Sequence, residues 1–211
     1  MKIIVLLLSL ATFITQAQMT DEIRAIQKQW AVVNYQIPEK QKEDEFEKLA
    51  KTATQYVVNH PKNAHALTWE GIVYSTYAGV AGTFSAGKLA KHAKKSFEQA
   101  IKIDGNVLNG SAYTSLGVLY FKVPGWPLSF GNNKKALKIL KKGLTLNPDG
   151  IDSNYFYADF LQDEQDDYQQ AKKYLLKAQS AAPRPSRPLA DTGRQAEITQ
   201  LLKKVNEELA D

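Results

Sequence analysis

Residues 116–148 decide the fold, and they read LGVLYFKVPGWPLSFGNNKKALKILKKGLTLNP. In this stretch a small residue, a large apolar residue and a second small residue occur at spacings of four and three, at Ala136, Leu140 and Gly143. Pro148 stands five positions later. These spacings place the three side chains on one stripe of a helix that ends in a turn before the proline.

The same pattern occurs three more times in the chain. Each copy ends five residues before Pro61, Gly105 or Pro183, and the successive end points are 44, 43 and 35 residues apart. The further copies are Leu49/Ala53/Tyr56, Ala93/Phe97/Ala100 and Ala171/Leu175/Ala178. The helix is therefore repeated, while the connections between its copies vary in length.

A partner helix precedes each of the last three stripes. Gly71 stands three residues before Tyr74, and Gly117 three residues before Tyr120. Ala158 takes the glycine position in the last copy. A small residue lets two helix backbones approach closely, and a ring three positions later covers the same face. Antiparallel helix pairs of this kind are the unit of an α-solenoid, so the sequence predicts an all-α fold.

This pattern resembles the tetratricopeptide repeat (TPR). The resemblance rests on Leu116, Gly117, Tyr120, Gly131, Ala136, Leu140, Gly143 and Pro148, and in the next copy on Tyr155, Ala158, Tyr168, Ala171, Leu175, Ala178 and Pro183. It implies one TPR-like domain over 18–211, with a degenerate repeat at 21–61, repeats at 64–105, 108–148 and 152–183, and a capping helix at 191–209. We expect Asp191 or Thr192 to begin that last helix, which closes the core of the last repeat.

A narrower resemblance is to the T-component family associated with TRAP transporters. It rests on residues 122–131, on 147–150 with Asp159 and Phe160, and on the stretch from Pro183 to Arg194. It implies an exported binding or docking protein. Members of that family are usually lipid-anchored, and this chain departs from them because it has no cysteine.

The first 17 residues are typical of a secretory signal peptide. Lys2 is followed by an apolar run from Ile3 to Ile14, and Ala17 ends a small-residue cleavage site. The run is shorter than the roughly 20 residues that a membrane-spanning helix needs. We therefore expect a periplasmic or secreted protein, cut after Ala17, with no transmembrane span.

Composition and isolated motifs disfavour several function classes. The chain has a formal charge of +5, no cysteine and three histidines, and its few arginines disfavour nucleic-acid recognition. The stretch 82–89 comes within one residue of a phosphate-binding P-loop, but Leu89 stands where Ser or Thr would bind magnesium. No pairing of a nucleophile with a base and no metal-ligand spacing is visible. The sequence predicts neither catalysis nor a metal or other cofactor.

In a TPR solenoid the first helix of each pair lines a concave groove. This resemblance nominates as groove residues His65, Thr68, Ile72 and Thr76, then Thr114, Val118, Phe121 and Lys122, and then Tyr155, Asp159 and Gln162. Two rings of the insertion at 123–130, Trp126 and Phe130, either fold back on the core or form the lip of the groove.

Five lysines between 134 and 142 form a ridge that is either a solvated convex face or a surface for anionic membrane headgroups or an acidic partner.

Two functions remain in view from the sequence. The first is a non-enzymatic TPR scaffold of the cell envelope that binds a protein or peptide in its groove. The alternative is a transporter accessory that binds a small organic ligand beneath the insertions at 75–88 and 123–130. Homo-oligomer formation stays open.

Overall fold

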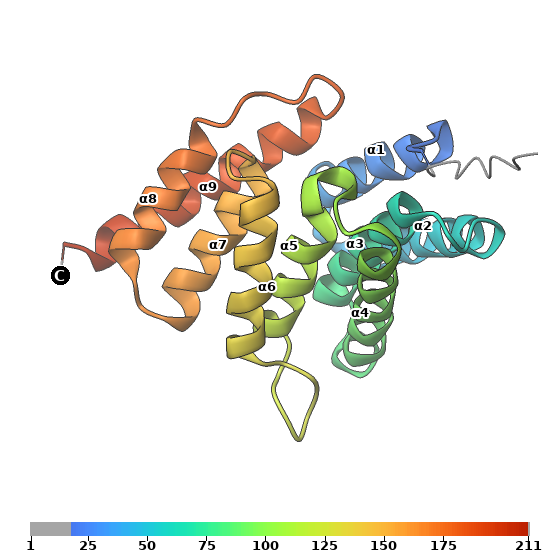
Figure 1. Ribbon diagram of the computed structural model, residues 1–211, viewed down its shortest axis with the longest axis horizontal. Helices are drawn as coiled ribbons and strands as arrows, with labels where there is room; N and C mark the ends of the chain where they lie inside the picture. The colour runs from blue at the N-terminus through green and yellow to red at the C-terminus, as the bar shows by residue number, and fades with distance from the viewer. Residues whose placement is uncertain (1–17, 211) are drawn as a thin grey trace, which may run out of the picture.

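The computed structural model describes residues 18–210, so the predicted signal peptide at 1–17 lies outside the described residues. Within 18–210 the chain forms nine α-helices, which stack side by side (Figure 1). Their bounds are α1 Asp21–Tyr35, α2 Glu39–Asn59, α3 Ala64–Val80, α4 Thr83–Asp104, α5 Val107–Lys122, α6 Asn133–Leu146, α7 Ile151–Glu164, α8 Tyr168–Gln179 and α9 Pro188–Glu208. None of these nine helices is long and apolar enough to cross a membrane.

The first eight helices form four pairs. α1 packs on α2, α3 on α4, α5 on α6 and α7 on α8, and each pair contacts the next one. The first helices of successive pairs also contact each other, so α1, α3, α5 and α7 form a continuous inner layer. The predicted all-α solenoid of antiparallel helix pairs is confirmed (Figure 1).

Side-chain caps fix where several helices begin. The side-chain oxygens of Thr20, Asn63, Asn132 and Asp167 each accept the backbone N–H three residues later, at the starts of α1, α3, α6 and α8. Such a cap satisfies one of the backbone donors that the first turn of a helix leaves without a partner. The start of each of these helices is thus encoded locally.

Small residues determine how closely the two helices of a pair approach. A methyl group added at Gly71 would lie 2.5 Å from Cε1 of Phe97, and one added at Gly117 would lie 2.6 Å from Cγ of Leu140. Ala158 is fully buried at the equivalent place in α7. The predicted close approach of the paired helices is therefore observed, and each glycine makes room for the large residue of its partner helix.

The last helix differs from the expected terminal cap. α9 begins at Pro188, and Asp191 lies in its first turn. The helix contacts α8 and α7, and it also reaches α1. Ala190 belongs to the hydrophobic cluster of α1–α3, whereas Ile198 and Val205 belong to the cluster of α4–α8. α9 thus links the two ends of the solenoid instead of only closing the last repeat.

The two insertions have different structures. The residues at 75–88 lengthen α3 and α4, which are separated by only Ala81 and Gly82. The residues at 123–132 form a loop that projects beyond the end of α6 (Figure 1). α1, the first helix of the repeat predicted to be degenerate, spans 15 residues and buries Ile23 and Trp30.

Candidate binding site

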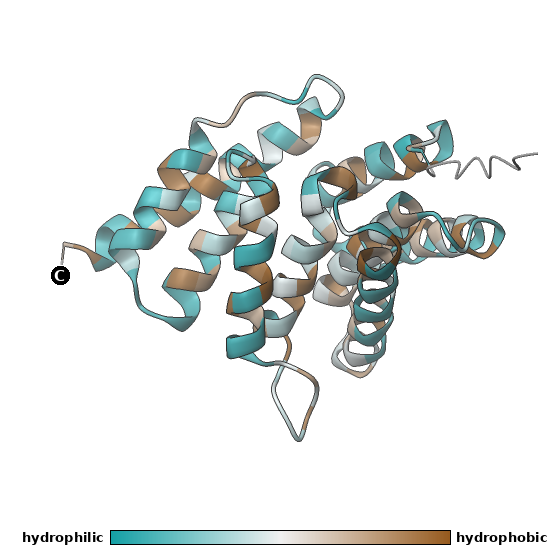
Figure 2. Ribbon diagram, viewed as in Figure 1, coloured by the Kyte–Doolittle hydropathy of each residue, from teal (hydrophilic) through white to brown (hydrophobic). Residues whose placement is uncertain are grey.

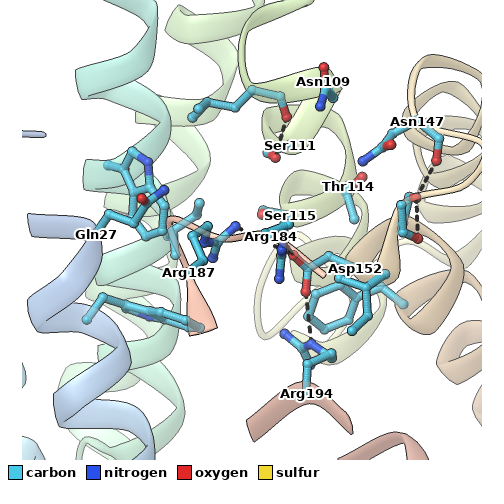
Figure 3. Close-up of a pocket in the computed structure, with 18 of the residues that line it drawn as sticks. Gln27, Asn109, Ser111, Thr114, Ser115, Asn147, Asp152, Arg184, Arg187 and Arg194 are labelled. Atoms are coloured by element: carbon cyan, nitrogen blue, oxygen red, sulfur yellow. Dashed lines mark hydrogen bonds and ion pairs between the residues drawn. The ribbon is translucent and has the colours of Figure 1, made fainter. Parts of the chain in front are cut away.

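A cavity of about 490 Å³ lies on the concave side of the solenoid, where the inner-layer helices meet the C-terminal connector (Figure 3). Its walls come from α1, α3, α5 and α7, and the connector at 182–187 and α9 close one side. Side chains that line it include Gln27, Trp30, Trp69, Ile72, Thr76, Thr114, Ser115, Val118, Asp152, Phe156, Arg184, Arg187 and Arg194.

Asp152 of α7 holds the connector and α9 against this cavity. One carboxylate oxygen accepts a hydrogen bond from Nη1 of Arg184 at 2.6 Å, and the other accepts one from Nε of Arg194 at 2.9 Å. Burial acts to raise the pKa of Asp152, but the positive charges of Arg194 and Arg184 outweigh it and hold the pKa well below its usual range. The carboxylate is therefore charged at neutral pH, and we refer to Asp152, Arg184 and Arg194 as the latch.

Further contacts strengthen the latch. Nε and the backbone N–H of Arg184 donate to the carboxylate of Asp191 at 2.7 and 2.6 Å. The guanidinium of Arg194 also pairs with Glu197, and its carbon lies 4.4 Å from the ring centres of both Tyr155 and Phe156. A planar guanidinium can donate hydrogen bonds to carboxylates and also stack on aromatic rings. The C-terminal segment is thereby attached to the inner face of α7.

Arg187 has much weaker charge compensation than its two neighbours. Its Nη1 lies 3.8 Å from the carboxylate of Asp152, and its guanidinium lies over the ring of Trp69 at 5.3 Å from the ring centre. Burial lowers the pKa of Arg187, and the positive charge of Arg184 adds to this effect, while Asp152 opposes it. A cation in this position attracts an anionic or strongly accepting group.

Two buried N–H donors in the cavity wall lack an acceptor. Nε of Arg187 and Nε1 of Trp69 have no hydrogen-bond partner among residues 18–210. By contrast, Nε1 of Trp30, in the same wall, donates to Oγ1 of Thr76 at 2.9 Å. A buried donor without a partner costs roughly 1–3 kcal/mol, so an acceptor within hydrogen-bond distance would stabilise either group.

The rim of the cavity has an unusual backbone conformation. Leu108, Asn109 and Gly110 have φ values of 52°, 53° and 74°, in the left-handed region that L-residues rarely adopt. The hydroxyl of Ser111 donates to the carbonyl of Leu108 at 2.7 Å and closes this turn. Backbone strain of this kind persists where the surrounding structure requires it, and here the turn directs Asn109 to the cavity rim (Figure 3).

The structure brings four of the predicted groove residues to this cavity. Ile72 and Thr76 of α3, and Thr114 and Val118 of α5, line its wall. His65, in the first turn of α3, lies outside the lining. The binding role of these residues stays a prediction.

Three of the predicted groove residues outside the cavity lining are buried, which corrects their expected placement. Thr68 is fully buried and donates to the carbonyl of Ala64, and Phe121 packs edge-on against Phe160. Gln162 accepts a hydrogen bond from Nζ of Lys204 in α9. Thr68 and Phe121 do not reach the groove because their side chains face the packed interior.

The two remaining predicted residues of α7 contact residues of neighbouring helices, Tyr155 one of α9 and Asp159 one of α5. Tyr155 lies under Arg194, and Asp159 pairs with Nζ of Lys122 at 3.1 Å. A second carboxylate, that of Asp163, also contacts Lys122, at 2.8 Å. These residues form the contact between α7 and its neighbours instead of an open groove.

Of the two alternatives that the sequence left open for the rings of the α5–α6 loop, only folding back on the core is observed, and only for Phe130. Phe130 folds back, with its ring centre 5.6 Å from that of Tyr120 in an edge-on contact. Trp126 is 89% exposed and lines no part of the concave cavity. The cavity also lies away from this loop, so neither ring forms a lip of the cavity.

Sequence reasoning missed the arginines of the latch. Three of the four arginines fall between 184 and 194, directly after the proline-rich connector, and this local concentration was the available signal. Their acidic partner Asp152 is more than thirty residues away, so the pairing depends on how α9 folds back. Among residues 18–210, no group of three His, Asp or Glu side chains is placed to hold a metal ion.

One known protein family matches part of the chain. The tetratricopeptide repeat family matches residues 151–185, which span α7, α8 and the start of the connector. No curated protein matches the chain at a significant level. The resemblance to the T-component family stays a prediction.

Among solved structures, the chain is similar to a crystal structure of MamA, with a sequence identity of 19% and a TM-score of 0.46. The match covers 81% of this chain and 92% of that chain. It is also similar to YrrB, described as a TPR protein with an unusual peptide-binding site, with 17% identity, 92% and 95% coverage, and a TM-score of 0.44.

Proposed function

We propose that this protein is a non-enzymatic binding scaffold that receives an acceptor-rich segment of a protein or peptide in its concave cavity. The observation that carries the proposal is the pair of buried donors, Nε of Arg187 and Nε1 of Trp69, that lack acceptors in the cavity wall. A carboxylate or carbonyl of the partner would satisfy them, and it would lie beside the poorly compensated charge of Arg187.

The proposed partner inserts a chain end or a side chain rather than lying along the whole groove. α9 covers the inner face of α7, where Arg194 stacks on Tyr155 and Lys204 bonds Gln162. The remaining inner surface belongs mainly to α1, α3 and α5. A long peptide would have to displace the latch, whereas a short segment fits without breaking those hydrogen bonds.

A small organic ligand is the second candidate. The cavity volume of about 490 Å³ lies within the range of about 300–1,000 Å³ in which proteins bind small molecules. The same donors would bind a carboxylate or another acceptor of such a ligand. A thermal-shift screen tests this candidate, because a ligand that binds only the folded state raises the melting temperature with its concentration.

The test of the main proposal is a variant that fills the cavity. Ser115 lines the cavity from α5 (Figure 3), so Ser115→Trp is expected to abolish capture of the partner by crosslinking in the cells that make the protein. Ser180→Trp, in an exposed turn, is the matched control and should capture the same partner as the natural sequence. Circular dichroism checks that both variants fold. Equal capture by both variants would refute the concave cavity as the binding site.

We also propose that residues 1–17 direct export, which would place the partner in the cell envelope. Mass spectrometry of the protein isolated from envelope and cytoplasmic fractions tests this. A mature chain beginning at Gln18 in the envelope fraction supports the proposal, and an intact N-terminus in the cytoplasm contradicts it.

A further inference from the structure

The outer sides of α4 and α6 carry an excess of positive charge. Together these helices contain ten lysines and two carboxylates, and α6 has five of the lysines and no carboxylate. Among residues 18–210, no ion pair joins a lysine of α6 to an acidic side chain. Figure 2 shows the hydrophilic residues along α6. We call the exposed sides of α4 and α6 the basic face.

Large apolar side chains are exposed next to the basic face. Trp126 and Leu128, in the loop before α6, are 89% and 81% exposed, and Phe84, in the first turn of α4, is fully exposed. The loop and the α3–α4 turn lie at the same end of the helix stack (Figure 1). We call these three residues the apolar tip. An exposed set of this kind is unusual for a surface that only faces water.

The α5–α6 loop has a fixed structure that holds Trp126 and Leu128 outward. The N–H of Asn132 donates to the carbonyl of Tyr120 at 2.7 Å, and the N–H of Gly131 donates to the carbonyl of Pro124 at 2.9 Å. Phe130 packs on Tyr120 and anchors the base of the loop. The exposure of Trp126 therefore follows from a structured loop and not from a lack of local hydrogen bonds.

Lysine side chains connect the loop to the basic face. Nζ of Lys94, on α4, lies 5.8 Å from the ring centre of Phe130, and Nζ of Lys135, on α6, lies 4.6 Å from that of Tyr120. The acidic side of this end is the last turn of α7, where Asp163 pairs with Lys122 and Glu164 contacts Asn133. Positive charge thus lies beside the base of the loop on the side of α4 and α6.

We propose that the basic face and the apolar tip together bind the surface of an anionic lipid bilayer. Trp126 and Leu128 insert at the level of the headgroups, where an indole places its apolar ring and its N–H in suitable surroundings. The lysines contribute about 1 kcal/mol each when they lie near anionic headgroups. Stable attachment to a membrane generally needs two such signals, and this surface supplies both an apolar and a basic one.

The tryptophans make this proposal directly measurable. Trp30 and Trp69 are 7% and 1% exposed, so among the three tryptophans of the chain Trp126 alone is open to solvent. On vesicles of phosphatidylcholine mixed with phosphatidylglycerol, we expect a blue shift of the emission and protection of one tryptophan from acrylamide. Vesicles of phosphatidylcholine alone should give neither effect.

Variants separate the two parts of the surface, with affinity measured by vesicle flotation. The double variant Trp126→Ala/Leu128→Ala should bind at least tenfold more weakly, because both insertion contacts are lost. Lys138→Gln/Lys141→Gln should lower the affinity about 30-fold. Lys28→Gln/Lys62→Gln, the same charge change at exposed positions elsewhere, is the matched control and should bind within about twofold of the natural sequence.

Three outcomes would overturn the proposal. The first is absence of binding to anionic vesicles at low salt, and the second is an equal loss of vesicle affinity in Lys138→Gln/Lys141→Gln and in the control Lys28→Gln/Lys62→Gln. The third is unchanged vesicle binding by Trp126→Ala/Leu128→Ala. Binding to an acidic polypeptide such as polyglutamate without binding to vesicles would identify a protein surface as the partner instead. Ser115→Trp, which fills the concave cavity, should leave vesicle binding unchanged, so this test is independent of the proposed partner of the cavity.

Discussion

Replacing Asp152 by asparagine should release the C-terminal segment from the concave side. The substitution keeps the size of the side chain but removes the charge that binds Nη1 of Arg184 and Nε of Arg194. It leaves three neighbouring guanidinium groups, including that of Arg187, without their shared carboxylate. Removing one member of a buried ion pair typically costs 3–5 kcal/mol. Asp152 retains 27% side-chain exposure, so we expect a loss of about 3 kcal/mol.

The size of this effect should depend on pH in a defined direction. The pKa of Asp152 is held well below its usual range in the folded protein, so the folded state binds fewer protons than the unfolded chain. The stabilisation of the fold by the Asp152 carboxylate is therefore complete above about pH 4, and it is lost progressively as the pH falls below that value. The difference between the natural sequence and Asp152→Asn should shrink in the same range.

Urea unfolding at pH 7, with hydrogen exchange read by mass spectrometry, measures both consequences. With a slope of about 2 kcal/mol per molar urea, the midpoint should fall by about 1.5 M, and residues 184–198 should lose protection first. Asp149→Asn is the matched control, because Asp149 pairs with Lys177 at 2.9 Å but is 86% exposed. It should change stability by less than about 0.5 kcal/mol. Equal midpoints for the two variants would refute the latch.

Two further predictions concern the packing of the solenoid and the cover over α7. Gly71→Ala should lower the unfolding free energy by about 1–3 kcal/mol, because the new methyl group would meet the ring of Phe97. Gly79→Ala, with open space around the new methyl group, should raise the unfolding free energy by about 0.5–1 kcal/mol. Urea unfolding of both variants measures the contrast. Burial raises the pKa of Tyr155 to about 12, although the charge of Arg194 opposes it. As the pH rises, the unfolded chain therefore releases this proton first, and the stability of the fold falls between about pH 10 and 12. In thermal melts over this range, the melting temperature of Tyr155→Phe should fall less than that of the natural sequence. An equal fall of the melting temperature would contradict the buried phenol.

Much of the fold could be predicted from local patterns. The stripes that end before Gly105, Pro148 and Pro183 are buried in the structure, and Gly71 and Gly117 stand at the closest approaches between helices. These features depend on residues three to five positions apart, which a helix places on one face whatever surrounds it. The same reasoning located Ile72, Thr76, Thr114 and Val118 on the inner layer, where they line the cavity.

The binding site could be predicted only in part because its cover comes from elsewhere in the chain. The sequence indicated a terminal helix, but its hydrophobic pattern does not say which core receives Ala190 or Ile198. The expectation of an open groove at Tyr155 and Gln162 failed for this reason. Likewise, an aromatic residue in a loop gives no sign of whether it folds back, as Phe130 does, or stays exposed, as Trp126 does.

The sequence by itself therefore determined the repeated helix pair, because periodicity and small-residue spacing act over a few turns of one helix. Only the tertiary structure decided that α9 returns to α1, that Asp152 meets Arg184 and Arg194, and that a cavity forms on the concave side. The two bonds of Asp152 join residues 32 and 42 positions apart, and the contact of α9 with α1 joins the first and last helices. The geometry of these contacts depends on how the four pairs stack. That accumulated curvature is a property of the whole solenoid, which no single segment encodes.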